Sequence, residues 1–451
     1  MIPSIRHQFQ TRSDVPPMTV MGGLKSPSFQ FDQIKTHIHQ QILEDMDLRR
    51  MESLPTDRLR QELQGLTESL IAQNQFALNE TERRQIAQGI QDEMLGLGPI
   101  EPLLADDSVS DILVNGPYKV FVERRGKIEP TDIRFDSEAH LLRVIDRIVS
   151  RIGRRIDEMS PMVDARLSDG SRVNAVIPPL AIDGPLLSIR RFAVVPYTVQ
   201  DLLRFGTLTA NMAALIDGLA KAKLNVLISG GTGSGKTTLL NVISASIPPD
   251  ERIVSIEDAA ELQLQQHHVV RMETRPANME GTGEVSQRAL LRNSLRMRPD
   301  RIILGEVRGS EVLDMLQAMN TGHEGSMSTI HANTPRHAMT RLEHMLGMAG
   351  MQTDARSMRQ QIAAALTVVI QVSRLSDGQR KVTSLQEITG MEGDVITMQE
   401  IFRFEQTGLT DEARVQGRFV ATGIRPKFFQ RLQSRGIALS PDMFSQAGEV
   451  S

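Results

Sequence analysis

The stretch NVLISGGTGSGKTTLL, residues 225–240, constrains the fold and the chemistry of this chain more than any other. An apolar run leads into a glycine-rich turn, and the turn leads into a helix that we expect to begin near Lys236. From Gly230 to Thr237 the residues match the phosphate-loop pattern G-x-x-x-x-G-K-[ST]. Glycines allow successive backbone N–H groups to point into one concavity, and the following helix directs its positive end to the same place. The stretch therefore predicts a site for a nucleoside triphosphate.

The polar side chains of this loop have expected roles. Lys236 can reach the β- and γ-phosphates and the Thr237 hydroxyl can ligate Mg²⁺, so ATP and Mg²⁺ are the predicted ligands. The alternative is a glycine-rich connection without a ligand, which the strand–loop–helix context disfavours. The predicted nucleotide-binding residues are Gly230, Gly231, Thr232, Gly233, Ser234, Gly235, Lys236, Thr237 and Thr238, with Arg271 and Arg275 as further candidates because they precede the loop TRPANMEGTGEV.

The composition argues against several other classes of protein. A net charge of −4, only two tyrosines and no tryptophan give no basic field and few aromatic rings for stacking on nucleic acid bases. The absence of cysteine excludes disulfides and thiolate metal sites. The N-terminus lacks the apolar core of a signal peptide, and no stretch approaches the roughly 18 apolar residues of a membrane span. We therefore expect a soluble protein that meets a membrane only through partners.

The chain of 451 residues is too long for one hydrophobic core, so several domains are expected. Apolar residues recur at helical spacing before residue 95, where Asn79 and Glu82 form a predicted capping box. Further on, apolar runs alternate with helical patterns, which predicts a parallel sheet of the α/β type. The predicted segments are a mobile N-terminus (1–28), a helical bundle (29–95), a mixed α/β domain (96–192), a linker (193–206), an ATPase core (207–375) and a β-rich C-terminal appendage (376–451).

Carboxylates follow two of the predicted strands. In RIILGEVRG, Glu306 comes just past an apolar run, where a parallel sheet delivers side chains to the phosphate end. The preceding position, which usually carries a metal-supporting Asp, is Gly305. In IVSIEDAAEL, Glu257 and Asp258 end another run, and either could supply the missing contact; we favour Glu257. The alternative for these two acids is a stabilising interaction with a helix N-terminus.

Histidines and arginines provide further candidates. His323 and His331 flank a predicted strand, and buried structural histidines or coupling of nucleotide state to a neighbouring subunit both fit their spacing. Zinc ligation lacks a third ligand. Arg190 and Arg191 lie near the predicted linker, where guanidinium groups could neutralise phosphate charge. Three other arginines are expected on an exposed helix face; they are Arg288, Arg292 and Arg296.

Taken in order, these segments resemble the secretion ATPase superfamily of type II secretion, type IV secretion and type IV pili. GGTGSGKTT resembles its Walker A motif, SIEDAAEL its Asp box, IILGEVRG its atypical Walker B with Gly before Glu, and TGHEGSMSTIHAN its His box. The resemblance covers about Pro99 to Ile388. The segment from ETRPANMEGTGEV to TIHANTP is most similar to the CpaF-type ATPases of Tad (Flp) pili. The absence of cysteine argues against classical pilus assembly ATPases, which commonly carry a tetracysteine zinc element.

The resemblance implies a homohexameric ring in which a mixed α/β N-terminal domain, preceded by the helical bundle, joins a RecA-like P-loop NTPase domain. It implies that Glu306 is the catalytic carboxylate, assisted by Glu257. It also implies that His323 and His331 sense the nucleotide and that Arg190 and Arg191 reach the phosphates. The expected function is a cytoplasmic motor at the inner-membrane face that drives pilus assembly through integral-membrane platform proteins. The alternatives are a VirB11-like secretion or conjugation ATPase and a slowly hydrolysing, nucleotide-gated scaffold; a nucleic-acid translocase fits less well.

Overall fold

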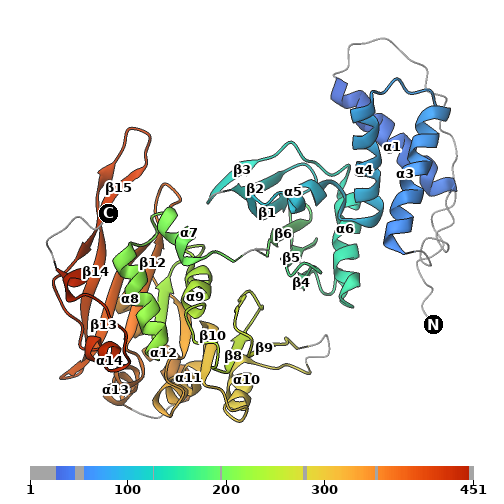
Figure 1. Cartoon of the computed structure of the whole chain (residues 1–451). Coiled ribbons are helices and arrows are strands. Elements are labelled where there is room, and N and C mark those ends of the chain that lie inside the picture. Colours follow the sequence, from blue (N-terminus) through green and yellow to red (C-terminus); the bar gives the residue numbers. More distant parts are fainter. Residues whose placement is uncertain are drawn as a thin grey trace. The chain divides into compact units, whose positions relative to one another are not determined.

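The structure is a computed structural model that describes residues 27–445 apart from 46–54, 125, 193–195, 278–281 and 351–353. The chain divides into two compact units, the first ending at Pro102 and the second beginning at Leu103. The segment expected to be a mobile N-terminus lies outside the described residues, except that its last two residues belong to a helix that begins at Pro27. Figure 1 labels the elements of both units.

The described part of the first unit contains three long helices, which are α1 (Pro27–Asp45), α3 (Thr56–Gln73) and α4 (Glu80–Leu95). The capping box predicted before α4 is confirmed, because the Asn79 side chain accepts from the Glu82 N–H and the Glu82 carboxylate accepts from the Asn79 N–H. The apolar faces of the helices bury a shared core made of Ile38, Ile42, Leu59, Leu63, Leu70, Ile71, Ile86 and Ile90. The short helices η1 (Gly98–Ile100) and α5 (Glu101–Ala105) follow.

A six-stranded antiparallel sheet begins the second unit. Its strand order is β3-β2-β1-β6-β5-β4. The helix α6 (Glu138–Arg151) begins after Ser137, whose side chain caps it by accepting from the His140 N–H. The strands are β1 (Val109–Asn115), β2 (Val120–Arg124), β3 (Lys127–Pro130), β4 (Met162–Arg166), β5 (Arg172–Val176) and β6 (Leu186–Arg190).

A second sheet, of nine strands, contains the strand that leads into the phosphate loop. Its order is β15-β14-β13-β12-β7-β11-β10-β8-β9, with parallel pairing from β12 to β9 and antiparallel pairing beyond β12. The predicted α/β class is therefore confirmed. The parallel strands are β7 (Val226–Gly230), β8 (Ile253–Glu257), β9 (Val269–Glu273), β10 (Arg301–Val307), β11 (Met327–His331) and β12 (Val368–Arg374).

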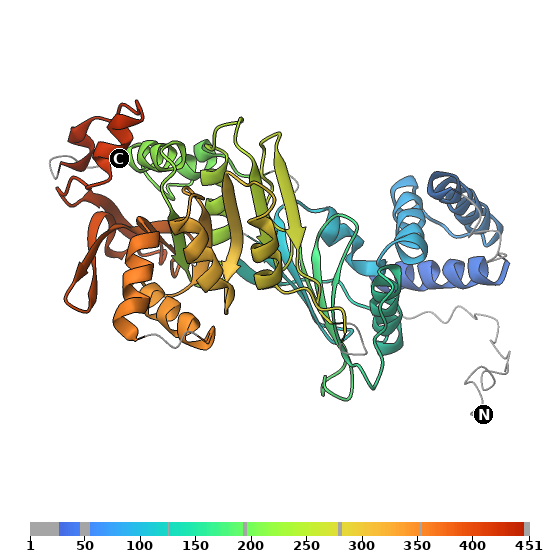
Figure 2. The same cartoon turned by 90° about the horizontal axis from the view of Figure 1, so that it is seen from below.

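Helices cover both faces of this sheet (Figure 2). Side chains of α8 (Ala210–Lys221) and α9 (Lys236–Ser244) pack on one face, in a core that includes Leu215 and Leu240. Side chains of α11 (Glu311–Asn320), α12 (Pro335–Met348) and α13 (Ala355–Ala365) pack on the other. Two shorter helices are α7 (Val199–Arg204) and α10 (Gln287–Ser294).

The C-terminal strands continue the same sheet. The strands β13 (Arg380–Glu392), β14 (Val395–Leu409) and β15 (Val415–Ala421) follow β12 without a break in the pairing, and the helices α14 (Phe429–Ser434) and η2 (Pro441–Phe444) close the described chain. Phe402, Phe429 and Phe444 join the core that lies against α8 and α9. The boundary expected between 375 and 376 stays a prediction, since one sheet spans it.

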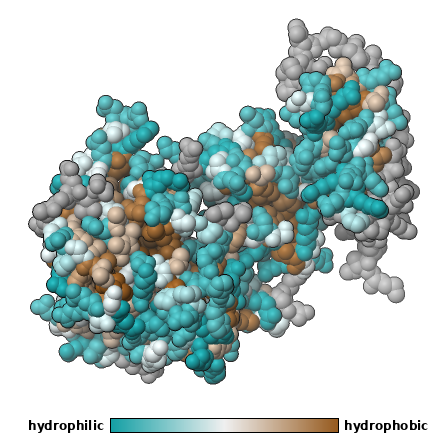
Figure 3. All heavy atoms as spheres, viewed as in Figure 1, coloured by the Kyte–Doolittle hydropathy of each residue, from teal (hydrophilic) through white to brown (hydrophobic). Residues whose placement is uncertain are grey.

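Polar side chains cover much of the visible surface in the space-filling view, with smaller apolar areas between them (Figure 3). Among the described helices, none is long and apolar enough to cross a bilayer.

Candidate functional site

The phosphate loop begins where β7 ends, in the interior of the nine-stranded sheet. Gly233 has φ +66° and Gly235, the N-cap of α9, has φ +99°, so the loop requires left-handed backbone at both positions. A Cβ at Gly230 would collide with Ser234 Oγ and the Val372 carbonyl. These glycines allow the backbone to wrap closely around the start of α9, which is the geometry that binds phosphate.

Lys236 is the first residue of α9 and folds back over the loop. Its Nζ donates to the Gly231 carbonyl oxygen over 3.0 Å. Burial lowers the pKa of the Lys236 ammonium, and Glu306 opposes that effect while Arg308, Arg341 and Arg190 add to it. Lys236 therefore lies within electrostatic reach of a carboxylate and of a guanidinium from the six-stranded sheet. A concentration of positive charge around a glycine loop favours a polyanionic ligand.

Glu306 lies within β10, whose last residue is Val307, so the expectation that it follows the strand is corrected. The pairing of β10 with β11 is irregular between Leu304 and Val307, and the Thr329 hydroxyl donates to the Gly305 carbonyl over 2.7 Å. The strand continues because its last residues pair again after this bulge, which the apolar pattern of the sequence does not encode.

Gly305 has a steric explanation. A Cβ added there would lie 2.9 Å from Cγ of Glu257, closer than side chains tolerate. The space that an Asp side chain would occupy at position 305 is therefore taken by the side chain of Glu257, from the neighbouring strand β8. This contact brings together the two segments from which the sequence predicted carboxylates.

Glu257 is buried at the end of β8, with 3% of its surface exposed. Burial raises the pKa of its carboxyl to about 7, although Oε2 accepts from the backbone N–H groups of Glu261 and Leu262 and Arg271 lies nearby. The other oxygen, Oε1, has no hydrogen-bond partner among the described residues. A buried carboxyl that titrates near neutrality and has a free oxygen can exchange a proton with a ligand.

Arg308 connects the remaining two acids, and the sequence reasoning missed it. Its guanidinium donates to Glu306 Oε2 over 2.7 and 3.1 Å and to Asp258 Oδ2 over 3.2 Å. Asp258 therefore faces an arginine rather than capping a helix, and Glu306 is held in an ion pair. The pattern E-V-R at the end of a predicted strand was a signal for this pair, since residues two apart in extended backbone share one face.

The two histidines lie at opposite ends of β11. His331 ends the strand, pairs in register with Gly230 of β7 and has a pKa lowered by burial and then by Lys236. His323 precedes the strand, at the amino edge of the parallel sheet, and its Nδ1 has no partner in the described part of the chain. The structure therefore brings His331 to the phosphate loop and does not bring His323 there. Among the described residues no cluster of three potential metal ligands is found.

A cavity of about 180 Å³ lies between the phosphate-loop helix and the six-stranded sheet. From the side of the nine-stranded sheet it is lined by Thr237 and Thr238 of α9 and by residues that follow β8. Arg190 Nε also contacts Asp111 Oδ1 over 3.1 Å, and its guanidinium is exposed by about half. The arginines that line the cavity from the six-stranded sheet are Arg166, Arg172, Arg190 and Arg191.

Arg191 differs from its neighbour. Its guanidinium donates to the backbone carbonyls of Asp106 and Val109 (3.0 Å for Val109) and reaches Asp107. It thus fixes the start of β1. Arg166, which the sequence analysis did not select, pairs with Glu273 of β9 over 3.0 Å. The sheet therefore offers Arg190 to a ligand more readily than Arg191.

Arg271 and Arg275 lie farther along β9 and the loop after it. Arg271 is exposed on β9 and acts electrostatically on Glu257. Arg275 pairs through its backbone with Val285, and its Nε donates to the Gly283 carbonyl over 2.8 Å. The loop that Arg275 and Val285 close includes residues 278–281, which are outside the described part of the chain. Their role in nucleotide binding stays a prediction.

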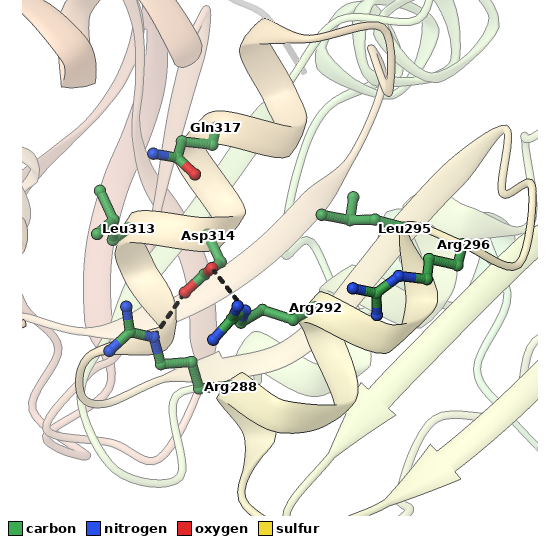
Figure 4. Close-up of a pocket in the computed structure, with 7 residues that line it drawn as sticks. All are labelled: Arg288, Arg292, Leu295, Arg296, Leu313, Asp314 and Gln317. Atoms are coloured by element: carbon green, nitrogen blue, oxygen red, sulfur yellow. Dashed lines mark hydrogen bonds and ion pairs between the residues drawn. The ribbon is translucent and has the colours of Figure 1, made fainter.

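A second hollow, of about 510 Å³, lies on the surface formed by α10 and α11 and contains no phosphate-loop residue (Figure 4). Arg288 and Arg292 both turn toward Asp314, at 2.7 and 4.0 Å, while Arg296 stands apart from it. Arg292 and Arg296 are exposed and Arg288 is half-buried. The expected helix face is thus largely confirmed, with one acid neutralising part of its charge.

The comparison with known proteins now decides the family. The family described as Type II/IV secretion system protein matches residues 93–422. The chain belongs to this family. A relative from Mycobacterium tuberculosis, named "Putative conjugal transfer protein", is 40% identical over 70% of this chain and 92% of the relative. The conjugal transfer protein TrbB of Rhizobium radiobacter is 34% identical over 64% of this chain and 86% of the relative.

A solved structure, the VirB11 ATPase from the Brucella suis type IV secretion system in complex with sulphate, is 27% identical and covers 64% of this chain and 92% of that chain, with a TM-score of 0.35. Proteins of the type II/IV secretion family are ATPases, so the chain is a secretion or pilus ATPase. The predicted superfamily is confirmed. The predicted fold, a RecA-like ATPase domain preceded by an α/β N-terminal domain, is confirmed as well.

Proposed function

We propose that this secretion ATPase hydrolyses ATP as a homohexameric motor and drives assembly of a Tad/Flp pilus through integral inner-membrane platform proteins. The observation that carries the ATPase part is the juxtaposition of the phosphate loop with Glu257, Glu306 and the arginine-lined cavity. A phosphate cradle, carboxylates near a strand end and guanidinium groups from another sheet are the parts that phosphoryl transfer requires.

The loop residues would bind and orient the triphosphate. Backbone N–H groups at the start of α9 face the phosphates, and Lys236 would exchange the Gly231 carbonyl for phosphate oxygens. The Thr237 hydroxyl would hold Mg²⁺, which would supply neutralisation of phosphate charge. Arg190 would add positive charge from the six-stranded sheet, because its guanidinium lines the same cavity as Thr237.

Two carboxylates would share the work on the attacking water. We assign the catalytic role to Glu306 and the assisting role to Glu257. Release of Glu306 from Arg308 would free a carboxylate to orient the water, while Glu257, with a pKa of about 7, can accept a proton at physiological pH. His331, beside Gly230, would sense the phosphate. His323 would act from the amino edge of the sheet, away from the phosphate loop.

The machine that the motor serves has two candidates. The motif resemblance favours a CpaF-type ATPase of a Tad pilus, at the cytoplasmic face of the inner membrane. The names of the relatives from Mycobacterium tuberculosis and Rhizobium radiobacter favour a conjugal transfer or VirB11-like secretion machine. Deleting the coding sequence and scoring surface pilin against transfer of a mobilisable plasmid distinguishes them.

Lys236→Ala tests the ATPase assignment itself. We expect loss of ATP turnover and of nucleotide binding by the purified protein, because the main cation of the phosphate loop is removed. Glu306→Gln should bind ATP and fail to hydrolyse it. Turnover by Lys236→Ala at the wild-type rate would refute the site, and binding without any turnover by the wild type would favour a nucleotide-gated scaffold.

A further inference from the structure

The turn between β12 and β13 touches the phosphate loop. Arg380, the first residue of β13, donates from Nε to the Gly233 carbonyl oxygen over 3.0 Å. Its Cδ would lie 3.4 Å from a Cβ on Gly235. Arg374, the last residue of β12, pairs in register with Arg380 and would lie 3.5 Å from a Cβ on Gly233. Two arginines about 140 residues beyond the loop in sequence therefore lie against its apex.

The same two arginines meet the six-stranded sheet. Glu123 of β2 lies 3.6 Å from Arg374 and 3.7 Å from Arg380 through one oxygen, and its side chain is only 16% exposed. The β2–β3 turn approaches as well, since a Cβ on Gly126 would lie 3.1 Å from the Gly378 carbonyl. One carboxylate of the N-terminal sheet thus faces two guanidinium groups that border the phosphate loop.

Hydrogen bonds hold the β12–β13 turn in a defined conformation. Its backbone closes on itself, with the Leu375 N–H donating to the Gln379 carbonyl over 2.7 Å. Asp377 accepts from the N–H groups of Gln379 and Val415, at 2.9 and 2.8 Å, and so ties the turn to β15. The backbone that carries Arg374 and Arg380 is therefore held in place. The position of each guanidinium charge then depends on the groups that it contacts.

We propose that Arg380 is a positioning residue of the phosphate loop. Its contact with Glu123 makes the position of the Arg380 guanidinium depend on the six-stranded sheet. The hydrogen bond to the Gly233 carbonyl fixes the peptide unit between Gly233 and Ser234, whose N–H donates to Gly231. Since the Gly231 carbonyl also accepts from Lys236, this peptide unit and the lysine share one acceptor. A movement of Glu123 would reorient Arg380 and, through it, the backbone that receives phosphate.

This proposal rests on the proposed nucleotide site and is tested by the affinity of the full chain for a non-hydrolysable ATP analogue with Mg²⁺, measured by calorimetry. Arg380→Gln should bind about tenfold more weakly, the effect of losing one charge-assisted hydrogen bond. Glu123→Gln should bind about threefold more weakly, as expected for a partly exposed ion pair. Because Glu123 acts through Arg380, the double variant should bind no more weakly than Arg380→Gln alone.

Arg418→Gln is the matched control, since Arg418 pairs with Glu405 on β14 and touches no loop residue in the described structure. Arg380→Lys keeps a charged donor for the Gly233 carbonyl and should bind within about threefold of the wild type. Wild-type affinity in Arg380→Gln, additive losses in the double variant, or tighter binding by Glu123→Gln would each overturn the proposal. Failure of the wild type itself to bind would instead overturn the nucleotide site.

Discussion

The buried carboxyl of Glu257 should make the stability of this ATPase depend on pH in a way that one substitution removes. Its pKa is about 7 in the folded chain against an ordinary value of 4.5, because burial disfavours the charged form. Below about pH 4.5 both states are protonated and the group costs nothing. As pH rises toward 7, the unfolded state loses its proton first, so the folded state is progressively destabilised, and the loss levels off above that value.

The size of the effect follows from the two pKa values. A pKa difference of one is equivalent to about 1.4 kcal/mol, so the whole range amounts to about 3 kcal/mol. Between about pH 5 and about pH 8 the folded state should lose about 2.5 kcal/mol through this group. Glu257→Gln keeps an oxygen for the N–H groups of Glu261 and Leu262 and cannot ionise. Its stability relative to the wild type should therefore rise by that amount over the same interval.

Urea unfolding followed by far-UV circular dichroism measures this difference, since the chain has no tryptophan for a fluorescence assay. Other groups that titrate in the interval affect the wild type and the variant alike and cancel in the difference. Asp377→Asn, a change of carboxyl to amide at a largely solvated turn, is a control for the substitution itself. Parallel stability curves for the wild type and Glu257→Gln from about pH 5 to about pH 8 would refute the assignment of a raised pKa.

Two further substitutions test the packing of strand β10, one near each of its ends. Gly305→Ala should destabilise the chain by about 1–3 kcal/mol in the urea assay and slow ATP turnover, because its Cβ would lie 2.9 Å from Glu257. The control is Gly347→Ala, on the exposed side of α12 with no atom within 4 Å of its Cβ, which should be neutral or stabilising by up to about 1 kcal/mol. Arg301→Met should cost about 3 kcal/mol, because the fully buried guanidinium pairs with Glu251 at 2.6 and 2.8 Å and its loss leaves Lys223, at 3.2 Å, as the remaining cation beside that carboxylate in the described structure. The double variant with Glu251→Leu should recover most of that loss, and an equal loss in the double variant would contradict the poorly compensated charge of Glu251 as the cause.

The sequence predicted those parts of the fold in which apolar residues have a clear period. Five apolar runs are predicted as strands, and they correspond to β7, β8, β10, β11 and β12 with ends that differ by at most three residues; the runs are 225–229, 252–256, 301–304, 326–330 and 368–372. The strand β9 was not identified, because it lies at the sheet edge and its side chains are at most half-buried. An edge strand lacks the continuous apolar run that a strand covered on both faces requires.

The chemistry of the loop was likewise readable from the sequence, whereas its surroundings were not. Gly230 to Thr237 form one contiguous pattern, so their proximity is local. Arg308, Arg374 and Arg380 reach the site only through strand order and through a turn that returns to the loop, which sequence spacing does not reveal. His323 precedes β11 and His331 ends it, so the two histidines lie at opposite edges of the sheet, and the sensing role of His323 stays a prediction.

The position of β7 in the sheet has a mechanical consequence. Four strands lie on each side of it, so the strand that supports the phosphate loop is the central one of nine. All five of its residues pair in register with both β11 and β12, and all five are buried. Amide hydrogens of this strand should exchange with solvent among the slowest of the second unit. Nucleotide-driven displacement must then appear in the elements around the loop, while its supporting strand acts as the fixed frame against which they move.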